Sequence, residues 1–230
     1  MIKLTPAQLR EYETQGFVLA PGVFPAGELS ELDREIDRLE APAAADAPHR
    51  GWVMSLAQRS EKTRAFAQDE RLLALIEEIV RPGIAIYSAK LTAKPPRSPE
   101  VCHWHQDDAY YIQNSSSRTR MSVWVPLQDA TPENGCLWVV PGSHRAGLQE
   151  HVTRPDGQCR LSMPEPLVDL SKAVPAPARA GSVLLFSALL WHASKGNATD
   201  GKRRAFIVSY QEASTVGGNG AQWKILRPAS

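Results

Sequence analysis

The sequence predicts an α+β fold, in which helices near the N-terminus pack against a core of antiparallel strands. Up to residue 83 the apolar residues recur at helical spacing, whereas from Ile84 onward they form short β-rich runs separated by turn residues. Helices followed by strands predict helices that buttress a sandwich or barrel. We expect one domain over residues 1–230, with a mainly helical part at 1–83 and a β core at 84–211.

Three helices are expected in the first 83 residues. Thr5-Pro6-Ala7-Gln8 is a capping-box pattern with proline at the first helical position, and this helix ends at Gly16. The apolar side of the second helix is formed by Leu29, Leu32, Ile36 and Leu39. A third helix should start after Asp69 and stop at Pro82-Gly83, with an apolar side formed by Leu72, Leu73, Ile76, Ile79 and Val80.

The strands are expected where β-branched and aromatic residues gather, at 84–91, 101–107, 121–127, 136–140, 182–186 and 203–211. Turn residues separate them, such as Pro141-Gly142 and Gly196-Asn197. The segment 145–180 has little periodicity and several prolines. A long connection of this kind inside a compact domain predicts a lid-like loop that closes over a site.

Composition favours a small molecule as the partner. The 26 Lys and Arg residues nearly cancel the 25 Asp and Glu residues, and no basic run suggests binding to nucleic acid or to an anionic membrane. The longest apolar stretch, at 183–191, is far shorter than the roughly 20 residues of a spanning helix. Three cysteines without C-x-x-C spacing, and a start without the pattern of a secretory signal, predict a reducing cytoplasm. Oligomeric state is not predicted.

His105-Gln106-Asp107 and the later His192 provide the ligand types of a redox-active metal centre. Residues two apart on a strand face the same side, so His105 and Asp107 can bind one ion while a remote strand supplies His192. Three protein ligands leave open coordination positions, which an Fe(II) oxygenase requires. Spacing alone does not exclude His103, on the same strand face, or Asp108, on the opposite one.

Four aromatic residues next to these positions are predicted to position a substrate, namely Trp104, Tyr110, Tyr111 and Trp191. The alternative is that they only pack the core. His144 lies in the turn Pro141-Gly142-Ser143-His144-Arg145 and is not expected to be a ligand.

Six stretches of the chain recur in the same order in a known family. They are Leu4-Thr5-Pro6 to Gly16-Phe17-Val18, Lys94-Pro95-Pro96, Trp104-His105-Gln106-Asp107, Glu133-Asn134-Gly135-Cys136-Leu137, Pro141-Gly142-Ser143-His144-Arg145, and His192-x-Ser194-x-x-Asn197 leading to Arg203. Through them the sequence resembles the phytanoyl-CoA hydroxylase (phytanoyl-CoA dioxygenase) family of Fe(II)- and 2-oxoglutarate-dependent oxygenases, over most of its length.

The resemblance implies a double-stranded β-helix core, that is, a cupin-like jelly roll, with His105, Asp107 and His192 as the iron ligands. It favours His105 over His103. It also places the anchor for the distal carboxylate of 2-oxoglutarate eleven residues after the second histidine, at Arg203. A guanidinium suits this task because its planar fork binds a carboxylate bidentately. Arg204, on the opposite strand face, is the alternative.

Three further residues match positions near the same co-substrate in the family: Ser194, Lys90 and Trp124. Each also has a purely structural interpretation. Ser194 can cap a turn, Lys90 can be a solvated strand residue, and Trp124 can be an ordinary core aromatic.

By resemblance, the enzyme uses O₂ and 2-oxoglutarate to hydroxylate a C–H bond of a small organic substrate, with release of succinate and CO₂. Related halogenating enzymes replace the acidic ligand with a small residue, so Asp107 favours oxygenation. The alternative function is a non-catalytic cupin-like protein that binds a metal or ligand. A zinc-dependent hydrolase or isomerase is disfavoured because it gives an arginine after the second histidine no role.

Overall fold

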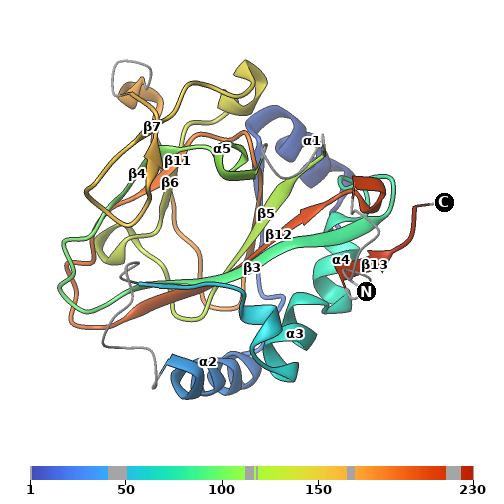
Figure 1. Cartoon of the computed structure of the whole chain (residues 1–230), viewed down its shortest axis with the longest axis horizontal. Helices are drawn as coiled ribbons and strands as arrows, with labels where there is room; N and C mark the ends of the chain where they lie inside the picture. Colours follow the sequence, from blue (N-terminus) through green and yellow to red (C-terminus); the bar gives the residue numbers. More distant parts are fainter. Residues whose placement is uncertain are drawn as a thin grey trace.

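The computed structural model describes residues 2–40, 51–111, 117, 119–164, 169–215 and 224–229. Within these residues two antiparallel sheets form a jelly-roll core (Figure 1). The larger sheet has the order β1 (Phe17–Ala20), β10 (Val183–Ser187), β5 (Met121–Pro126), β12 (Arg203–Gln211), β3 (Ile84–Lys94) and β13 (Ile225–Arg227), and β2 (Trp52–Val53) also pairs with β3. The smaller sheet has the order β4 (Cys102–His105), β11 (His192–Ser194), β6 (Leu137–Val139) and β9 (Val174–Ala176).

Helices cover the larger sheet on the side away from the smaller one, as predicted for an α+β fold (Figure 1). The α-helices are α1 (Pro6–Gln15), α2 (Ala26–Glu40), α3 (Glu61–Ala67), α4 (Glu70–Ile76) and α5 (Asp108–Tyr111). Short 3-10 turns occur at Leu56–Gln58, Pro132–Asn134, Ser143–Ala146, Leu170–Lys172 and Ala213–Thr215.

The predicted N-terminal cap of α1 is confirmed. The Thr5 hydroxyl accepts a hydrogen bond from the Gln8 backbone N–H, and the Gln8 side chain accepts one from the Thr5 N–H. Gly16 then ends the helix with a φ of 82°, a conformation that glycine adopts without steric cost.

The predicted third helix is confirmed at its start and wrong at its end. The Asp69 side chain caps α4 by accepting from the Arg71 N–H, but the helix stops at Ile76 instead of continuing to Pro82-Gly83. Beyond Ile76 the chain forms a turn, in which the N–H groups of both Ile79 and Val80 donate to the Ile76 carbonyl. The short helix α3 was not predicted.

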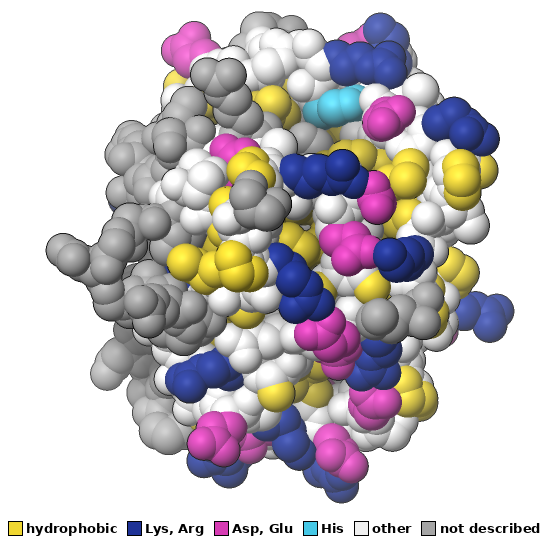
Figure 2. All heavy atoms as spheres, turned by 90° about the vertical axis from the view of Figure 1, so that its right-hand side faces the viewer, with side chains coloured by type: hydrophobic (Ala, Val, Ile, Leu, Met, Phe, Trp, Pro, Cys, Tyr) yellow, Lys and Arg dark blue, Asp and Glu magenta, His cyan; other side chains and the backbone are white. Residues whose placement is uncertain are grey.

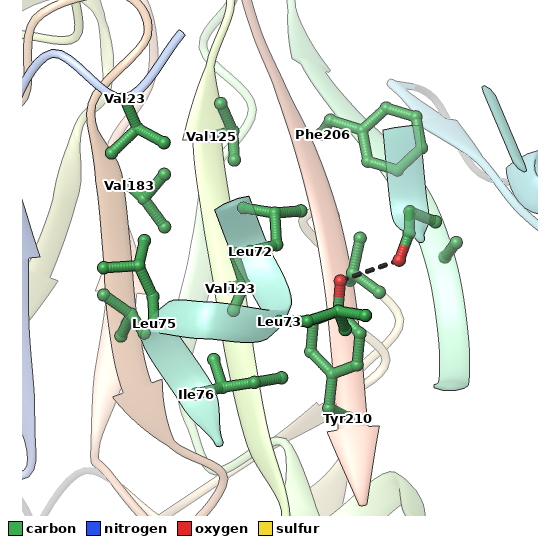
Figure 3. Packing of buried hydrophobic residues seen from close by; sticks show 14 of the residues in the cluster. Val23, Leu72, Leu73, Leu75, Ile76, Val123, Val125, Val183, Phe206 and Tyr210 are labelled. Carbon is green, nitrogen blue, oxygen red and sulfur yellow. Dashed lines mark hydrogen bonds between the residues drawn. The ribbon is translucent and has the colours of Figure 1, made fainter. Parts of the chain in front are cut away.

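The larger sheet is buried on both faces, and its alternating side chains build two separate cores. On the outer face, Val123, Val125, Val183, Phe206 and Tyr210 pack with residues of α4 (Figure 3). The Tyr210 hydroxyl donates to the Ala67 carbonyl at 2.8 Å, which ties the sheet to α3. The inner face, with Trp124, Phe186 and Ile207, packs towards the smaller sheet.

The predicted strands are confirmed, with shifted ends, and β12 has the predicted bounds. The segment 145–180 contains more structure than a loop. It includes the hairpin of β7 (Val152–Thr153) and β8 (Leu161–Ser162) and the strand β9, while 165–168 lie outside the described residues. Its function as a lid stays a prediction.

On the described part of the face that carries α4 and β13, charges of both signs are mixed. Figure 2 shows Lys and Arg side chains interspersed with Asp and Glu there. Several are paired, for example Lys3 with Glu77 and Arg227 with Glu70. None of the helices within the described ranges has the length and apolar character needed to cross a membrane.

Candidate functional site

Neighbouring strands of the smaller sheet bring the two predicted histidine ligands together. His192, which begins β11, is the cross-strand partner of His105, which ends β4, and their ring centroids lie 4.1 Å apart. Asp107 follows two residues later, and its Oδ1 lies 4.0 Å from Nε2 of each histidine. All three side chains are buried. The arrangement therefore places three metal-ligating atoms around one point.

Both imidazoles are oriented by backbone carbonyls. His105 Nδ1 lies 2.8 Å from the His103 carbonyl, and His192 Nδ1 lies 2.9 Å from the Leu190 carbonyl. Each Nδ1 must donate, because a carbonyl only accepts, so each Nε2 keeps its lone pair towards Asp107. Burial lowers the pKa of both histidines, which keeps the rings neutral and able to bind a cation.

Asp107 is held by a buried chain of polar groups from the larger sheet and α5. The Ser122 hydroxyl donates to Asp107 Oδ2 at 2.5 Å, and Ser122, Ser209 and Tyr111 are linked by contacts of 3.2 and 2.9 Å. Lys90 Nζ donates to the Tyr111 hydroxyl and lies 3.9 Å from Asp107 Oδ1. Burial alone would raise the pKa of Asp107, but the charge of Lys90 and the hydrogen bond from Ser122 act against burial, and the pKa stays below its usual value.

The alternative ligands are engaged elsewhere. The His103 ring lies 3.2 Å from the Asp156 carboxylate, and Asp108 accepts a hydrogen bond from Arg120 at 2.5 Å. His144 Nε2 faces the Glu13 carbonyl at the start of the chain.

Arg203 and Arg204 point to opposite faces of β12. The Arg204 guanidinium, on the outer face, pairs with three acidic residues of α2, namely Asp33, Asp37 and Glu40. Arg203, on the inner face, is 1% exposed and donates only through Nη2, to the Gly135 carbonyl at 2.9 Å. Within the described residues its Nε and Nη1 have no hydrogen-bond partner. Burial lowers the pKa of Arg203 to about 10, so the group is still a cation at neutral pH.

A narrow cavity joins Arg203 to the three metal-ligating residues. Its wall also includes the predicted Ser194, Lys90 and Trp124. Trp124 Nε1, like the free atoms of Arg203, is a buried donor without an acceptor in the described part of the chain. Unpaired buried donors are costly. An anion with several acceptor oxygens, such as a dicarboxylate, fits this donor set.

A larger cavity of about 320 Å³ also reaches this centre, since His105 and Asp107 line it too. Tyr110 and Tyr111 line it, and their role in positioning a substrate stays a prediction. Trp104 and Trp191 instead pack with Val140 and Met163 in a small apolar cluster.

Sequence reasoning missed Gln106, the middle residue of the motif. Its side chain is fully buried, donates to the carbonyls of Gly147 and Leu189, and accepts from the Gln149 N–H. It thereby fixes the end of β4 to the segment that follows Gly147. No local pattern reveals this role, since the partners lie 41 to 83 residues away.

The expectation of reduced cysteines was wrong for two of the three. Cys102 on β4 and Cys159 on the β7–β8 hairpin form a disulfide, and Cys136 is free and buried. Cys159 lines the larger cavity and Cys102 the narrow one. The hairpin was expected to be a loop, so its proximity to Cys102 was not visible in the sequence.

Comparison with known proteins identifies the family. The family model for phytanoyl-CoA dioxygenase matches residues 12–205. The chain belongs to this family. Phytanoyl-CoA dioxygenase domain-containing protein 1 of Bos taurus is 25% identical over 276 residues, which cover 93% of this chain and 92% of that protein. Ectoine dioxygenase of Sphingopyxis alaskensis is 29% identical over 230 residues, covering 89% and 75%.

A solved structure of the same fold supports the cofactors. EvdO2 of Micromonospora carbonacea var. aurantiaca, complexed with 2-oxoglutarate, is 25% identical, with a TM-score of 0.73 and coverage of 96% of this chain and 97% of that one. This phytanoyl-CoA dioxygenase family member is an Fe(II)- and 2-oxoglutarate-dependent dioxygenase. Its neutral histidines, its buried aspartate and its free donors fit a ferrous ion and a dicarboxylate.

Proposed function

We propose that His105, Asp107 and His192 bind Fe(II), that Arg203 anchors 2-oxoglutarate, and that the chain hydroxylates a small organic molecule bound in the larger cavity. The observation that carries the proposal is the convergence of two histidine Nε2 atoms on Asp107 Oδ1, each at 4.0 Å. Bound iron would supply the activation of O₂ coupled to oxidation of 2-oxoglutarate to succinate and CO₂.

The protein's own residues perform three tasks in this proposal. Ser122 and the two backbone carbonyls orient the ligands, so that little reorganisation is needed when the metal binds. Arg203, helped by Trp124 and Ser194, holds the distal carboxylate of 2-oxoglutarate. Tyr110 and Tyr111 position the substrate, and the 145–180 segment contributes to excluding water.

Anaerobic titration tests the cofactor assignment. Fe(II) and 2-oxoglutarate added to the wild-type chain should give a weak visible charge-transfer band. We expect Arg203→Ala to weaken 2-oxoglutarate binding by at least about tenfold, because a charge-assisted contact is lost. The matched control is Arg204→Ala, the next residue on the opposite strand face, which should keep the affinity within about twofold.

Turnover separates an enzyme from a binding protein of the same fold. Aerobic succinate release should be abolished in His105→Ala and in Asp107→Ala. Equal succinate release by these variants and the wild type would contradict the metal assignment. A normal charge-transfer band without succinate release, over a broad substrate panel, would favour the non-catalytic alternative.

The cytoplasm is the compartment we propose, with a small-molecule substrate as the partner. The Cys102–Cys159 disulfide counts against this location, since disulfides persist mainly in oxidising compartments, so cell fractionation is the decisive measurement. Recovery of the chain from a periplasmic or secreted fraction would contradict the proposal.

A further inference from the structure

The larger cavity carries more positive than negative charge. The charged side chains that line it are Lys90, Arg160 and Asp107. Asp107 is committed to the metal in the proposed function, and Lys90 lies beside it, bonded to Tyr111. The Arg160 guanidinium has no hydrogen bond or ion pair to any part of the chain that the structure describes. The nearby Asp156 is engaged by Arg154 and His103 instead.

Trp52, Tyr110 and Tyr111 line the larger cavity, and their polar groups already make hydrogen bonds within the protein. The Tyr110 hydroxyl bonds to the N–H and carbonyl of Leu161, and Trp52 Nε1 donates to the Gln158 carbonyl. The Tyr111 hydroxyl bonds to Lys90 and Ser209. These side chains therefore offer ring surface to a ligand and little hydrogen-bonding capacity.

One uncharged group of the cavity, the Tyr87 hydroxyl, remains for a polar substituent, since it has no hydrogen bond to another described residue. Ser88 also lines the cavity, but its hydroxyl oxygen is fully buried and has no hydrogen-bond partner in the described part of the chain. A sugar or another polyol would bring more hydroxyls than the Tyr87 hydroxyl can satisfy, and a buried hydroxyl without a partner is costly. The substrate's body must therefore be mainly apolar.

The volume and the charged residues of the larger cavity narrow the class of substrate further. A volume of about 320 Å³ is near the lower end for ligand pockets, so the space suits a compact molecule. A cationic substrate would face both Lys90 and Arg160. Arg160 is exposed, and Met54, which also lines the cavity, is 46% exposed, so the Arg160 guanidinium marks the mouth of the cavity. A phosphate dianion would be poorly matched by this one cation.

We propose that the substrate is a compact, ring-containing carboxylic acid whose carboxylate pairs with Arg160 at the mouth while its apolar ring lies between the aromatic side chains. This inference deepens the proposed function and rests on it for the identity of the reacting site. It makes Arg160 a specificity-determining residue. The C–H bond to be oxidised then lies on the part of the molecule opposite the carboxylate.

Binding without turnover tests the inference. Ligand-observed NMR on the full chain, loaded with Zn(II) and 2-oxoglutarate, compares 3-phenylpropionate and cinnamate with their primary amides, with 3-phenylpropylamine and with methyl glucoside. We expect the acids to bind at least about tenfold more tightly than the amides, and the amine and the sugar to bind more weakly still. Arg160→Gln should remove the preference for the acids, and Arg160→Lys should retain part of it.

The matched control is Arg154→Gln, because Arg154 lies in the same hairpin but pairs with Asp156. It should leave the preference intact. Any of three results would overturn the inference. The amides could bind as tightly as the acids, the acids could bind Arg160→Gln as tightly as the wild type, or neither acid could bind at all. The same series without metal and 2-oxoglutarate separates the two proposals. A preference that depends on Arg160 would survive there even if the triad did not bind iron.

Discussion

The orientation of Asp107 depends on residues that the His105-Gln106-Asp107 motif does not contain. Ser122 holds Oδ2 from the facing sheet, which leaves Oδ1 directed at the two histidines. Sequence spacing predicted His105, Asp107 and His192 as a ligand set but left His103 and Asp108 as alternatives, and the family resemblance favoured His105. Neither identified Ser122, since a serine in an apolar strand has no signal of its own and its partner is 15 residues away.

We predict that Ser122→Ala lowers the affinity for Fe(II) or Co(II) by about tenfold without unfolding the chain, because the carboxylate loses the contact that fixes its rotamer. Metal titration followed by absorbance measures the effect. Ser209→Ala is the matched control, since Ser209 contacts Ser122 but not Asp107 in the described interactions, and it should change the affinity by less than about threefold. Equal losses in both variants would show that the network acts as one structural unit instead.

Among the elements, those with strong local patterns were the ones that the sequence predicted. The capped α1, the amphipathic α2 and the continuous β12 were found from their own residues. The strand β1 was missed because four residues carry too little periodicity, and its identity depends on pairing with the distant β10. The β7–β8 hairpin was missed for the same reason. It contributes Gln158, Cys159 and Arg160 to the larger cavity through contacts that no local pattern encodes.

The disulfide gives this hairpin a testable dependence on redox state. Cys102 and Cys159 close a loop across 57 positions and join the hairpin to the strand that carries His105. We predict that reduction, or Cys159→Ser, lowers the free energy of unfolding by about 2–4 kcal/mol and speeds hydrogen exchange in residues 154–163. Denaturant unfolding and exchange mass spectrometry measure the two effects.

Cys136→Ser is the control for this prediction, because Cys136 is free and buried, and reductant should not change the stability difference between this variant and the wild type. Identical exchange in the oxidised and reduced wild type would contradict a tethering role. In that case the hydrogen bonds of Gln158 would be enough to hold the hairpin against β3, since its side chain accepts from Lys94 and donates to the Ala93 carbonyl.

Across the whole molecule, the larger sheet separates two environments, one on each of its faces. The outer face of the larger sheet meets α4 through apolar side chains. The inner face carries the buried basic residues Lys90, Lys94 and Arg203. Asp107 is the only acidic residue that is buried within the described ranges. The interior is therefore arranged to receive anions, which agrees with a dicarboxylate co-substrate and with an acidic substrate.

Because Lys94 is buried among these basic residues, we predict that the free energy of unfolding depends on pH. Burial, followed by the neighbouring Arg203, lowers the pKa of Lys94 to about 7. The unfolded chain keeps the ordinary value of about 10.5, so between pH 7 and pH 10 it holds a proton that the native chain lacks. Stability should therefore rise with pH over this range, and Lys94 should contribute about 2 kcal/mol between pH 7 and pH 9.

Urea unfolding at several pH values should show this rise in the wild type and its loss in Lys94→Met. The wild type and Lys94→Met share all other titratable groups, so the difference between their slopes reports on Lys94. Lys62→Met is the control, because Lys62 is exposed and its removal should leave the slope unchanged. Saturating 2-oxoglutarate should also flatten the slope, since a dianion beside Arg203 favours the charged form of Lys94. A slope shared by the wild type and Lys94→Met would mean that Lys94 stays protonated in the core, compensated by the Glu100 carbonyl and Gln158.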